Sequence, residues 1–180
     1  VQGNPDIEIS HLIYDSRKAG KDDLFVCIKG TAVDGHKFVG EVAQKGAAAI
    51  VVQEDVEAPE GVTVIKVEDT RYALALLSAA YFDHPAKELT TIGITGTKGK
   101  TTATYMVRSI LEASGFKTGL IGTIETIIGD TVIPSVNTTP ESYVVQESFR
   151  KMVDAGCKCV VMEVSSQALM LHRVSGFVFD

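Results

Sequence analysis

A glycine loop placed between an apolar run and a helical pattern constrains the fold of this chain most. Residues 90–95 are rich in β-branched side chains, and they lead into a loop that ends in Gly99-Lys100-Thr101. Apolar residues at helical spacing follow directly, at positions 105, 106, 110 and 111. The backbone N–H groups of such a loop, together with the amino end of the next helix, bind phosphate oxygens. The order of strand, loop and helix therefore predicts a phosphate-binding loop.

Two side chains of this loop carry the expected chemistry. Lys100 would reach the β and γ phosphates of a nucleotide, and the hydroxyl of Thr101 would bind Mg²⁺. The spacing departs from the general pattern, because Ile94 occupies the position of its first glycine, with Gly93 before it and Gly96 after it. A chance Gly-Lys in a tight turn is the alternative. The strand before the loop and the helix after it favour phosphate binding.

The composition narrows the function classes. The chain has 180 residues, which suits one domain or two small ones, and a formal net charge of −6 without a basic block. That charge argues against a nucleic-acid partner held on a basic surface. No apolar run has the length of a membrane span, and the three cysteines form no Cys-x-x-Cys pair; Cys27 is expected to be a small buried hydrophobe. We therefore expect a cytoplasmic protein without membrane contact.

Strand and helix patterns alternate along the chain. Strands are expected at residues 24–28, 48–52, 62–67, 90–95, 118–121 and 159–164, and a hairpin over 124–133 turns at Gly129-Asp130. Helices are expected at about 38–43, 70–81, 100–115 and 140–155, where Asp69 or Thr70 caps the second helix and Thr139 caps the last. Strands separated by helices indicate an α/β fold with a parallel sheet in each half.

The short polar segment 86–89 is the best candidate for a domain boundary. It follows His84-Pro85, which ends a helix, and it precedes the strand that leads into the phosphate loop. We therefore expect an N-terminal α/β domain at residues 1–88 and a doubly wound, mostly parallel phosphate-loop domain at residues 89–180. The second half has few strands for such a domain, so we expect the chain to be the front part of a longer protein.

An acidic residue at the end of an apolar strand is the second candidate for chemistry. Glu163 follows the run 160–162 and precedes Ser165 and Ser166. In a doubly wound sheet, ligands bind at the carboxyl ends of the strands. Glu163 is therefore predicted to bind a metal ion or to orient water near the phosphate loop. The alternative is a carboxylate that pairs with a lysine or an arginine.

Four further polar segments have ordinary explanations when only their residues are considered. Segments 15–17 and 34–36 are predicted to be turns, the first with a surface ion pair, and 137–140 is predicted to start a helix. His172-Arg173 is either an anion site or a surface pair. None of the four histidines lies at ligand spacing to another, so a histidine-based metal site is not expected.

Taken together, these segments resemble the Mur ligase family. The phosphate loop of that family reads Thr-Gly-Thr-x-Gly-Lys-[Ser/Thr]-[Ser/Thr], and residues 95–102 match it, including the displaced glycine. Lys98 stands where the family usually has asparagine, so a second cation is expected near the phosphates. The resemblance implies that ATP binds to seven residues of the loop, which are Gly96, Thr97, Lys98, Gly99, Lys100, Thr101 and Thr102.

The resemblance extends to four other motifs in the same order. These are Asp-Ser-Arg at 15–17, the loop 30–36, Asn-Thr-Thr-Pro at 137–140 and Met-Glu-Val-Ser-Ser at 162–166. The implied substrate-binding residues are Ser16, Thr31, Asn137, Thr138, Thr139, Ser165 and Arg173. The implied Mg²⁺ ligands are Thr101, for an ion at the phosphates, and Glu163, for a second ion between the γ-phosphate and the substrate carboxylate. The implied catalytic residues are Lys100 and Glu163. Gln167 departs from the family, which commonly has histidine there, so fine substrate contacts are expected to differ.

The resemblance also implies a reaction. Within the family, the likeness is to the ligase that adds the third amino acid to UDP-N-acetylmuramoyl-L-alanyl-D-glutamate in peptidoglycan precursor synthesis. ATP would convert the substrate carboxylate into an acyl phosphate, which an amino-acid acceptor then attacks. Meso-diaminopimelate is the expected acceptor and L-lysine the alternative. The resemblance further implies a UDP-substrate-binding domain at 1–88, a monomer, and a 180-residue chain that is inactive by itself.

Three other functions remain open at this point. A folylpolyglutamate synthetase-like ligase has a similar loop, but the Asp-Ser-Arg motif at 15–17 argues against it. A phosphate-loop kinase or GTPase would need a base-reading motif such as Asn-Lys-x-Asp, which the sequence lacks. A non-catalytic nucleotide-binding fragment would bind the UDP substrate in the absence of ATP.

Overall fold

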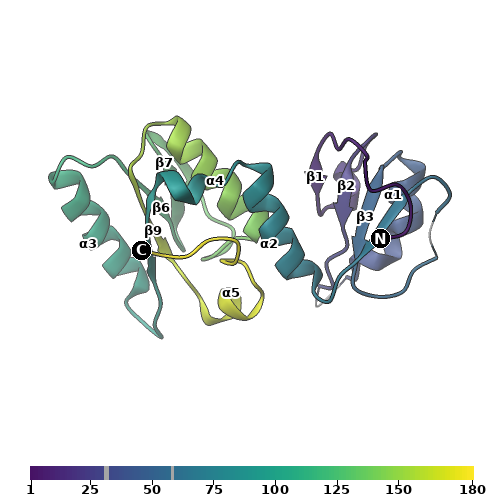
Figure 1. Ribbon diagram of the computed structural model, residues 1–180. Helices are drawn as coiled ribbons and strands as arrows, with labels where there is room; N and C mark the ends of the chain where they lie inside the picture. The colour runs from purple at the N-terminus through teal and green to yellow at the C-terminus, as the bar shows by residue number, and fades with distance from the viewer. Residues whose placement is uncertain (31–32, 58) are drawn as a thin grey trace. The chain divides into compact units, whose positions relative to one another are not determined.

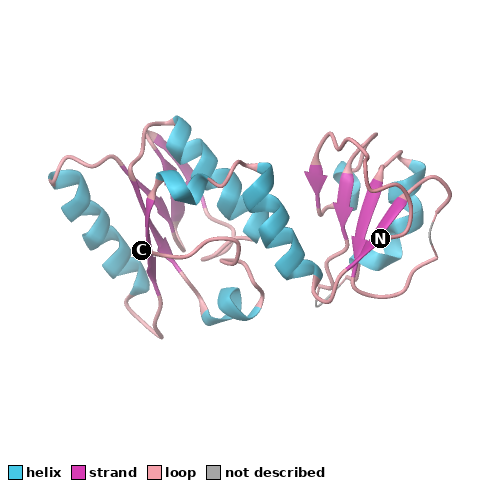
Figure 2. Cartoon of the chain, viewed as in Figure 1, coloured by secondary structure: helices cyan, strands magenta, loops and turns pink. Residues whose placement is uncertain are grey.

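The computed structural model describes residues 1–180 except residues 31, 32 and 58. Contacts within the chain divide it into two compact units, Val1–Leu74 and Ala75–Asp180. The ribbon in Figure 1 follows both units from the N-terminus to the C-terminus, and Figure 2 shows that each contains strands and helices. The predicted α/β class is confirmed. Among the described residues, no helix combines the length and the apolar character that crossing a membrane requires.

The first unit contains a four-stranded sheet in which every pair is parallel. The strands pair in the order β1 (Leu12–Ile13), β2 (Leu24–Val26), β3 (Ala49–Val52) and β4 (Thr63–Lys66). The connecting helices are η1 (Ser16–Lys18), η2 (Gly35–Phe38) and α1 (Val39–Gln44). Every residue of β2 and β3 is buried, as expected for parallel strands with continuous apolar runs. Cys27 belongs to this core and is fully buried, which confirms its predicted role.

Helix α2 (Thr70–Tyr81) contains the border between the two units. Asp69 caps it, because its carboxylate accepts hydrogen bonds from the N–H groups of Arg71 and Tyr72. The polar segment at 86–89 forms the turn η3 (Pro85–Glu88), which lies in the second unit, and Leu89 is buried in the core of that unit. The domain division at residue 88 therefore stays a prediction, whereas the contacts divide the chain earlier.

The second unit contains a five-stranded sheet whose order differs from the chain order. The strands pair as β5 (Thr90–Ile94), β9 (Cys159–Glu163), β6 (Thr118–Ile121), β7 (Glu125–Ile128) and β8 (Thr131–Pro134). The first three are parallel, and β7 and β8 continue the sheet as the predicted antiparallel hairpin. Helices α3 (Lys100–Ala113) and α4 (Ser142–Asp154) lie on opposite faces of this sheet (Figure 1). The doubly wound α/β arrangement is confirmed, and two of the four strand pairs in this sheet are parallel.

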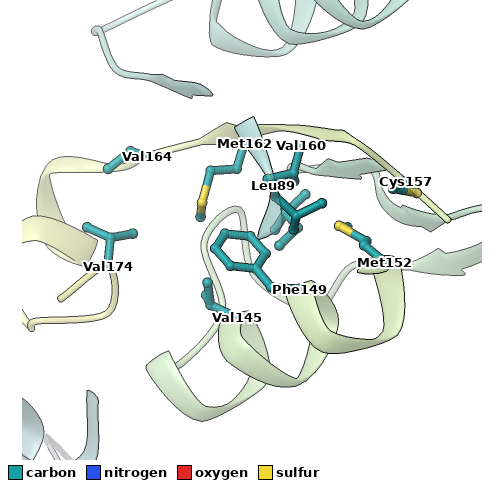
Figure 3. Packing of buried hydrophobic residues seen from close by; sticks show 10 residues of the cluster. Leu89, Val145, Phe149, Met152, Cys157, Val160, Met162, Val164 and Val174 are labelled. Carbon is teal, nitrogen blue, oxygen red and sulfur yellow. The ribbon is translucent and has the colours of Figure 1, made fainter. Parts of the chain in front are cut away.

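The main core of this unit lies between the sheet and α4. Phe149 and Met152 of the helix pack against Val160 and Met162 of β9, and all four are fully buried (Figure 3). Gly119 allows this close packing, because a side chain there would collide with Met152. Burial of large apolar side chains is the main source of the stability of this contact.

Two details of the helices differ from the sequence expectation. Helix α4 begins at Ser142, so Thr139 does not cap it; the hydroxyl of Thr139 bonds to the main chain of Glu163 instead. On α3, Met106 and Ile110 are 61% and 64% exposed, whereas Thr104 is buried. The apolar spacing therefore predicted the helix correctly but did not identify the face that this unit buries.

Candidate functional site

The phosphate-loop segment lies between β5 and α3, as predicted. Strand β5 ends at Ile94, and the 14-residue helix α3 begins at Lys100. Gly96 and Gly99 have φ values of 150° and 79°, which side chains rarely tolerate, so both positions favour glycine. Residues 95–99 are exposed, and Lys100 donates a hydrogen bond of 2.7 Å to the carbonyl oxygen of Gly96. The loop therefore presents the amino end of a long helix and one folded-back lysine to solvent.

Glu163 lies at the carboxyl end of β9, directly beside the end of β5. Its register partner is Ile94, the last strand residue before the loop, and only 1% of Glu163 is exposed. One carboxylate oxygen accepts from the N–H of Thr123 at 2.8 Å. The other accepts from the hydroxyls of Thr123 at 3.1 Å and Thr101 at 3.0 Å. In the described part of the chain, the partners of Glu163 are thus neutral donors, and the predicted alternative of a lysine or arginine pair is not found.

A buried carboxylate of this kind is suited to a cation. Burial disfavours an isolated negative charge, and hydrogen bonds from neutral groups compensate it only in part. The Thr101 hydroxyl and the Glu163 carboxylate are hard oxygen ligands of the type that Mg²⁺ prefers, and they already lie within hydrogen-bond distance of each other. The structure therefore brings the two predicted metal ligands together beside the phosphate loop.

The Asn-Thr-Thr-Pro segment is fastened to the same edge of the sheet. The buried hydroxyl of Thr139 donates to the carbonyl of Glu163 at 2.7 Å and accepts from the N–H of Ser165 at 3.1 Å. Thr138 and Thr123 share a hydroxyl hydrogen bond of 3.1 Å. Asn137 is exposed at the start of this segment. Three of the predicted substrate residues therefore lie on one loop at the phosphate-loop end of β9.

Arg173 and Ser165 have structural contacts at this edge. Arg173 donates to the carbonyl of Thr139 at 3.0 Å and to the carboxylate of Glu141 at 3.1 Å, which holds the Asn-Thr-Thr-Pro loop in place. Ser165 caps the short helix α5 (Ser166–Met170) by accepting from the N–H of Ala168. Both residues were predicted to bind substrate, and these contacts give each a second role.

Of the predicted substrate residues of the first unit, Ser16 begins the short 3-10 helix η1. Ser16 is 9% exposed and follows Asp15, whose carboxylate accepts two hydrogen bonds from the guanidinium of Arg17 at 2.8 and 2.7 Å. That pairing lowers the pKa of Asp15 to about 2. Thr31 lies outside the described residues. Ser16 is therefore held in a short element that Asp15 caps, and its predicted substrate contact stays a prediction.

The turn at 34–36 uses its polar atoms internally. Asp34, His36 and Glu54 bring potential ligand atoms within 4.8 Å of one another. However, one ring nitrogen of His36 contacts Asp34 at 2.6 Å, and the other accepts from the N–H of Gln53 at 3.1 Å. Glu54 pairs with Lys29. These contacts make the segment the turn that its sequence predicts.

Two residues of the site are missing from the sequence prediction. Thr123 supplies two of the hydrogen bonds to Glu163, and Gly122 makes room for that carboxylate, since a Cβ atom there would lie 2.7 Å from its oxygen. Both follow β6, which neighbours β9 in the sheet. The rule that ligands bind at carboxyl ends of strands applies to β6 as well, but strand order was needed to place it beside β9.

The comparisons with known proteins identify the family of this chain. Residues 94–180 match the profile described as Mur ligase middle domain, and residues 8–82 match the one described as Mur ligase family, catalytic domain. A curated relative, the UDP-N-acetylmuramoyl-L-alanyl-D-glutamate–2,6-diaminopimelate ligase of Clostridium perfringens, is 52% identical over 180 residues. That alignment covers 100% of this chain and 37% of the relative. The chain thus spans little more than a third of the relative's length.

Solved structures show the same fold. A structure of a UDP-N-acetylmuramoyl-L-alanyl-D-glutamate–2,6-diaminopimelate ligase superposes with a TM-score of 0.83 at 20% identity, covering 100% of this chain and 37% of that one. The MurF ligase of Thermotoga maritima in complex with ADP gives a TM-score of 0.56 at 22% identity, covering 91% of this chain and 34% of that one. The fold, the motifs and the two profiles agree, and the chain belongs to the Mur ligase family.

Proposed function

We propose that this chain supplies the UDP-substrate-binding and ATP-binding parts of a ligase that adds diaminopimelate to UDP-N-acetylmuramoyl-L-alanyl-D-glutamate. The main support for the proposal is the 3.0 Å hydrogen bond from the Thr101 hydroxyl to the Glu163 carboxylate. This contact lies beside the glycine loop that contains Lys100. The 52% identity to a curated ligase with this acceptor supports diaminopimelate over lysine. Because the chain covers 37% of that relative, the ligase activity is proposed for the whole protein.

The loop residues would bind the triphosphate of ATP. The N–H groups of residues 96–102 and the amino end of α3 provide donors for the phosphate oxygens, and Lys100 exchanges its bond to the Gly96 carbonyl for a phosphate oxygen. Lys98 is exposed in the same loop and adds a second positive charge. This arrangement neutralises and aligns the transferred phosphoryl group, which is the main requirement of phosphoryl transfer.

Thr101 and Glu163 would hold Mg²⁺. When bound, the ion supplies positive charge that lets the phosphate and the substrate carboxylate approach each other. Glu163 is held ready for that role by Thr123, and its main chain is fixed through Thr139. Burial keeps bulk water away from the carboxylate, and its hydrogen bonds to Thr101 and Thr123 fix its orientation.

The substrate contacts form the less direct part of the proposal. Asn137 and Thr138 lie on the loop that joins the phosphate-loop edge, so they are suited to bind the muramoyl-peptide. Arg173 would bind substrate through the guanidinium N–H groups that do not bond to Glu141 or Thr139. Ser16 and Thr31 would contact the uridine diphosphate in a domain that extends to residue 88. A monomer in the cytoplasm is the corresponding prediction for the whole protein.

Nucleotide titration of the Lys100→Ala variant tests the phosphate loop. The loss of a charge-assisted contact to phosphate should weaken Mg²⁺-dependent ADP or ATP binding at least about tenfold. Lys98→Ala is the comparison variant: it also removes a positive charge near the phosphates, but not the lysine that the loop pattern directs at the β and γ phosphates, so it should lose less affinity. Equal affinity of parent and Lys100→Ala would refute the assigned role. Isothermal titration calorimetry measures both variants, and circular dichroism confirms their folding.

A second titration separates the substrate from its alternatives. The chain should bind UDP-N-acetylmuramoyl-L-alanyl-D-glutamate in the absence of ATP and should not bind folate. Binding of folate instead would favour the folylpolyglutamate-like ligase. In the whole protein, Lys100→Ala should abolish acyl-phosphate formation, which is measured as ADP release; near-normal release would contradict the mechanism.

A further inference from the structure

The carboxyl edge of the first sheet carries a histidine whose two ring nitrogens both have partners. His36 follows β2 in the turn η2, and its side chain is 7% exposed. Its Nδ1 lies 2.6 Å from the carboxylate of Asp34, and its Nε2 accepts from the main-chain N–H of Gln53 at 3.1 Å. Because Nε2 accepts, the ring proton of a neutral His36 is on Nδ1, which donates to Asp34. The imidazole thus joins the segments that follow β2 and β3, two neighbouring strands (Figure 1).

Gln53 extends this connection to the end of the next strand. Its side-chain oxygen accepts from the hydroxyl of Thr70 at 2.8 Å and from the N–H of the same residue at 3.3 Å. Thr70 is fully buried and begins helix α2, which follows β4. The hydrogen bonds from Asp34 through His36 and Gln53 to Thr70 therefore hold together the segments after β2, β3 and β4. All four residues belong to the first unit.

The segment that His36 holds is the base of a tightly closed loop. Lys29 and Asp34 form an isolated antiparallel bridge, and the N–H of Gly35 donates to the carbonyl of Ile28 at 2.9 Å. A Cβ atom on Gly35 would lie 2.8 Å from the main-chain nitrogen of Ile28, so this close approach favours glycine. The bonds of His36 then fix the base of the loop against the end of β3.

The location of this loop connects it with ligand binding. In parallel α/β sheets, ligands bind outside the carboxyl ends of the strands, and both the loop and Ser16 follow strands at that edge. A loop that is already held in its binding position raises affinity, because less ordering is required when the ligand binds. A neutral imidazole suits this task, since its rigid ring has a donor on one side and an acceptor on the other.

We propose that His36 is a positioning residue for the uridine diphosphate end of the substrate. In its Nδ1–H form it holds the loop that begins at Lys29 in the position that binds this ligand, and it does not touch the ligand itself. The inference rests on the proposed function, in which the first unit binds the UDP substrate. It adds that the strength of this binding depends on a histidine whose ring bonds are made within the protein.

Calorimetric titration of His36 variants tests the proposal with two ligands, UDP-N-acetylmuramoyl-L-alanyl-D-glutamate and, separately, Mg²⁺ with ADP. His36→Phe keeps a ring but removes both hydrogen bonds, so its affinity for the UDP substrate should fall at least about tenfold. Its affinity for ADP should equal that of the parent, because the phosphate loop lies in the other unit. His36→Gln offers an oxygen to the N–H of Gln53, so it should lose only about threefold.

His11→Gln is the matched control. His11 also contacts a carboxylate, that of Asp23 at 3.0 Å, but it precedes β1 and lies at the opposite edge of the same sheet. Its replacement should leave both affinities unchanged. Imidazole ¹⁵N nuclear magnetic resonance of the unliganded parent adds a spectroscopic readout, in which Nδ1 of His36 should carry the proton and Nε2 should not.

The outcomes separate this inference from the proposed function. A parent chain that does not bind the UDP substrate would refute the proposed function and, with it, the role of His36. If the parent binds, equal affinity of His36→Phe, a parallel loss of ADP affinity, no recovery in His36→Gln or a proton on Nε2 would each overturn the inference alone. If His36→Phe does not fold, Gln53→Leu replaces it, since it cuts the connection to Thr70, and the same loss for the UDP substrate alone is expected.

Discussion

Two carboxylates, one in each unit, are held in opposite ways. Asp15 in the first unit is paired with Arg17, two residues away, and the side chain of Arg17 is 86% exposed. Glu163 in the second unit is almost fully buried, and its partners Thr101 and Thr123 lie 62 and 40 positions away in the sequence. A motif of three residues is sufficient to build the first arrangement. The second exists only because a sheet brings three strand ends together.

The two carboxylates also differ in how their negative charges are balanced. The Asp15 charge is balanced by a cation in solvent, where such a pair contributes little to stability. The Glu163 charge lies in the interior and is met by hydroxyl and N–H groups, so its own negative charge is left for a cation to neutralise. The exposed pair is a local structural contact, whereas the buried carboxylate has the surroundings that our proposal requires of a cation ligand. The following variants test this difference.

Glu163→Ala should have the largest effect. It deletes a buried side chain and leaves the Thr101 hydroxyl and both donors of Thr123 without their acceptor. The free energy of unfolding should therefore fall by about 2–4 kcal/mol. Urea denaturation followed by circular dichroism measures this. Glu163→Gln is the matched control, since it keeps the volume, and it should lose less stability but all Mg²⁺-dependent gain in nucleotide affinity. A Glu163→Ala variant as stable as the parent would contradict the buried network.

Gly122→Ala should have the second largest effect on stability. The added Cβ would lie 2.7 Å from the Glu163 carboxylate, which is fixed by its donors, so the local packing has to shift at a cost of about 1–3 kcal/mol. Gly40→Ala, at a position on α1 where a Cβ would meet nothing, is the control and should not lose stability. Thermal unfolding compares the two. Equal melting temperatures would mean that Glu163 adapts freely.

Thr123→Val should have a smaller effect. It removes the hydroxyl that bonds to Glu163 and to Thr138 but keeps the backbone N–H bond, so a loss of about 1 kcal/mol is expected. Thr123→Ser keeps the hydroxyl and should lie close to the parent in the same urea measurement. If the serine variant is destabilised as much as the valine variant, the methyl group and not the hydroxyl is responsible.

Arg17→Gln should change stability least and is best followed by the pKa of its partner. Without the guanidinium, the pKa of Asp15 should rise from about 2 toward 3.8. A lowered folded-state pKa stabilises the fold above the unfolded value, and that contribution disappears as the pH falls from about 4 to about 2. The variant should therefore lose less stability than the parent across this window. Carboxyl NMR titration measures the pKa, and Lys18→Gln, which removes a more weakly acting charge, should shift it less.

Much of the fold could be predicted because its signals are local. The strand, loop and helix at β5 and α3, the hairpin of β7 and β8, and the end of α4 all follow from apolar spacing and glycine positions. The Asp69 cap was one of two local candidates, and a choice between them needed the hydrogen bonds of the folded helix. Local patterns thus identify elements but leave their exact ends open.

The differences between prediction and structure concern how segments that are distant in the sequence lie against one another. Thr139 looks like a helix cap in sequence, yet Glu163 takes its hydroxyl, and the helix begins at Ser142. Met106 and Ile110 have core spacing, yet the second unit leaves them exposed. Thr123 has no motif of its own, and only the pairing of β6 with β9 reveals its contact with Glu163.

The sequence by itself determined the family, and with it the proposed chemistry, since the phosphate loop and the other family motifs are contiguous runs whose local conformation follows from glycine, β-branched and helical patterns. It also distinguished Glu163 from the other carboxylates, because this residue ends an apolar strand. Only the tertiary structure decided how that carboxylate is held. The order β5, β9, β6 brings the ends of three strands to one edge, and hydrogen bonds act only over that short distance.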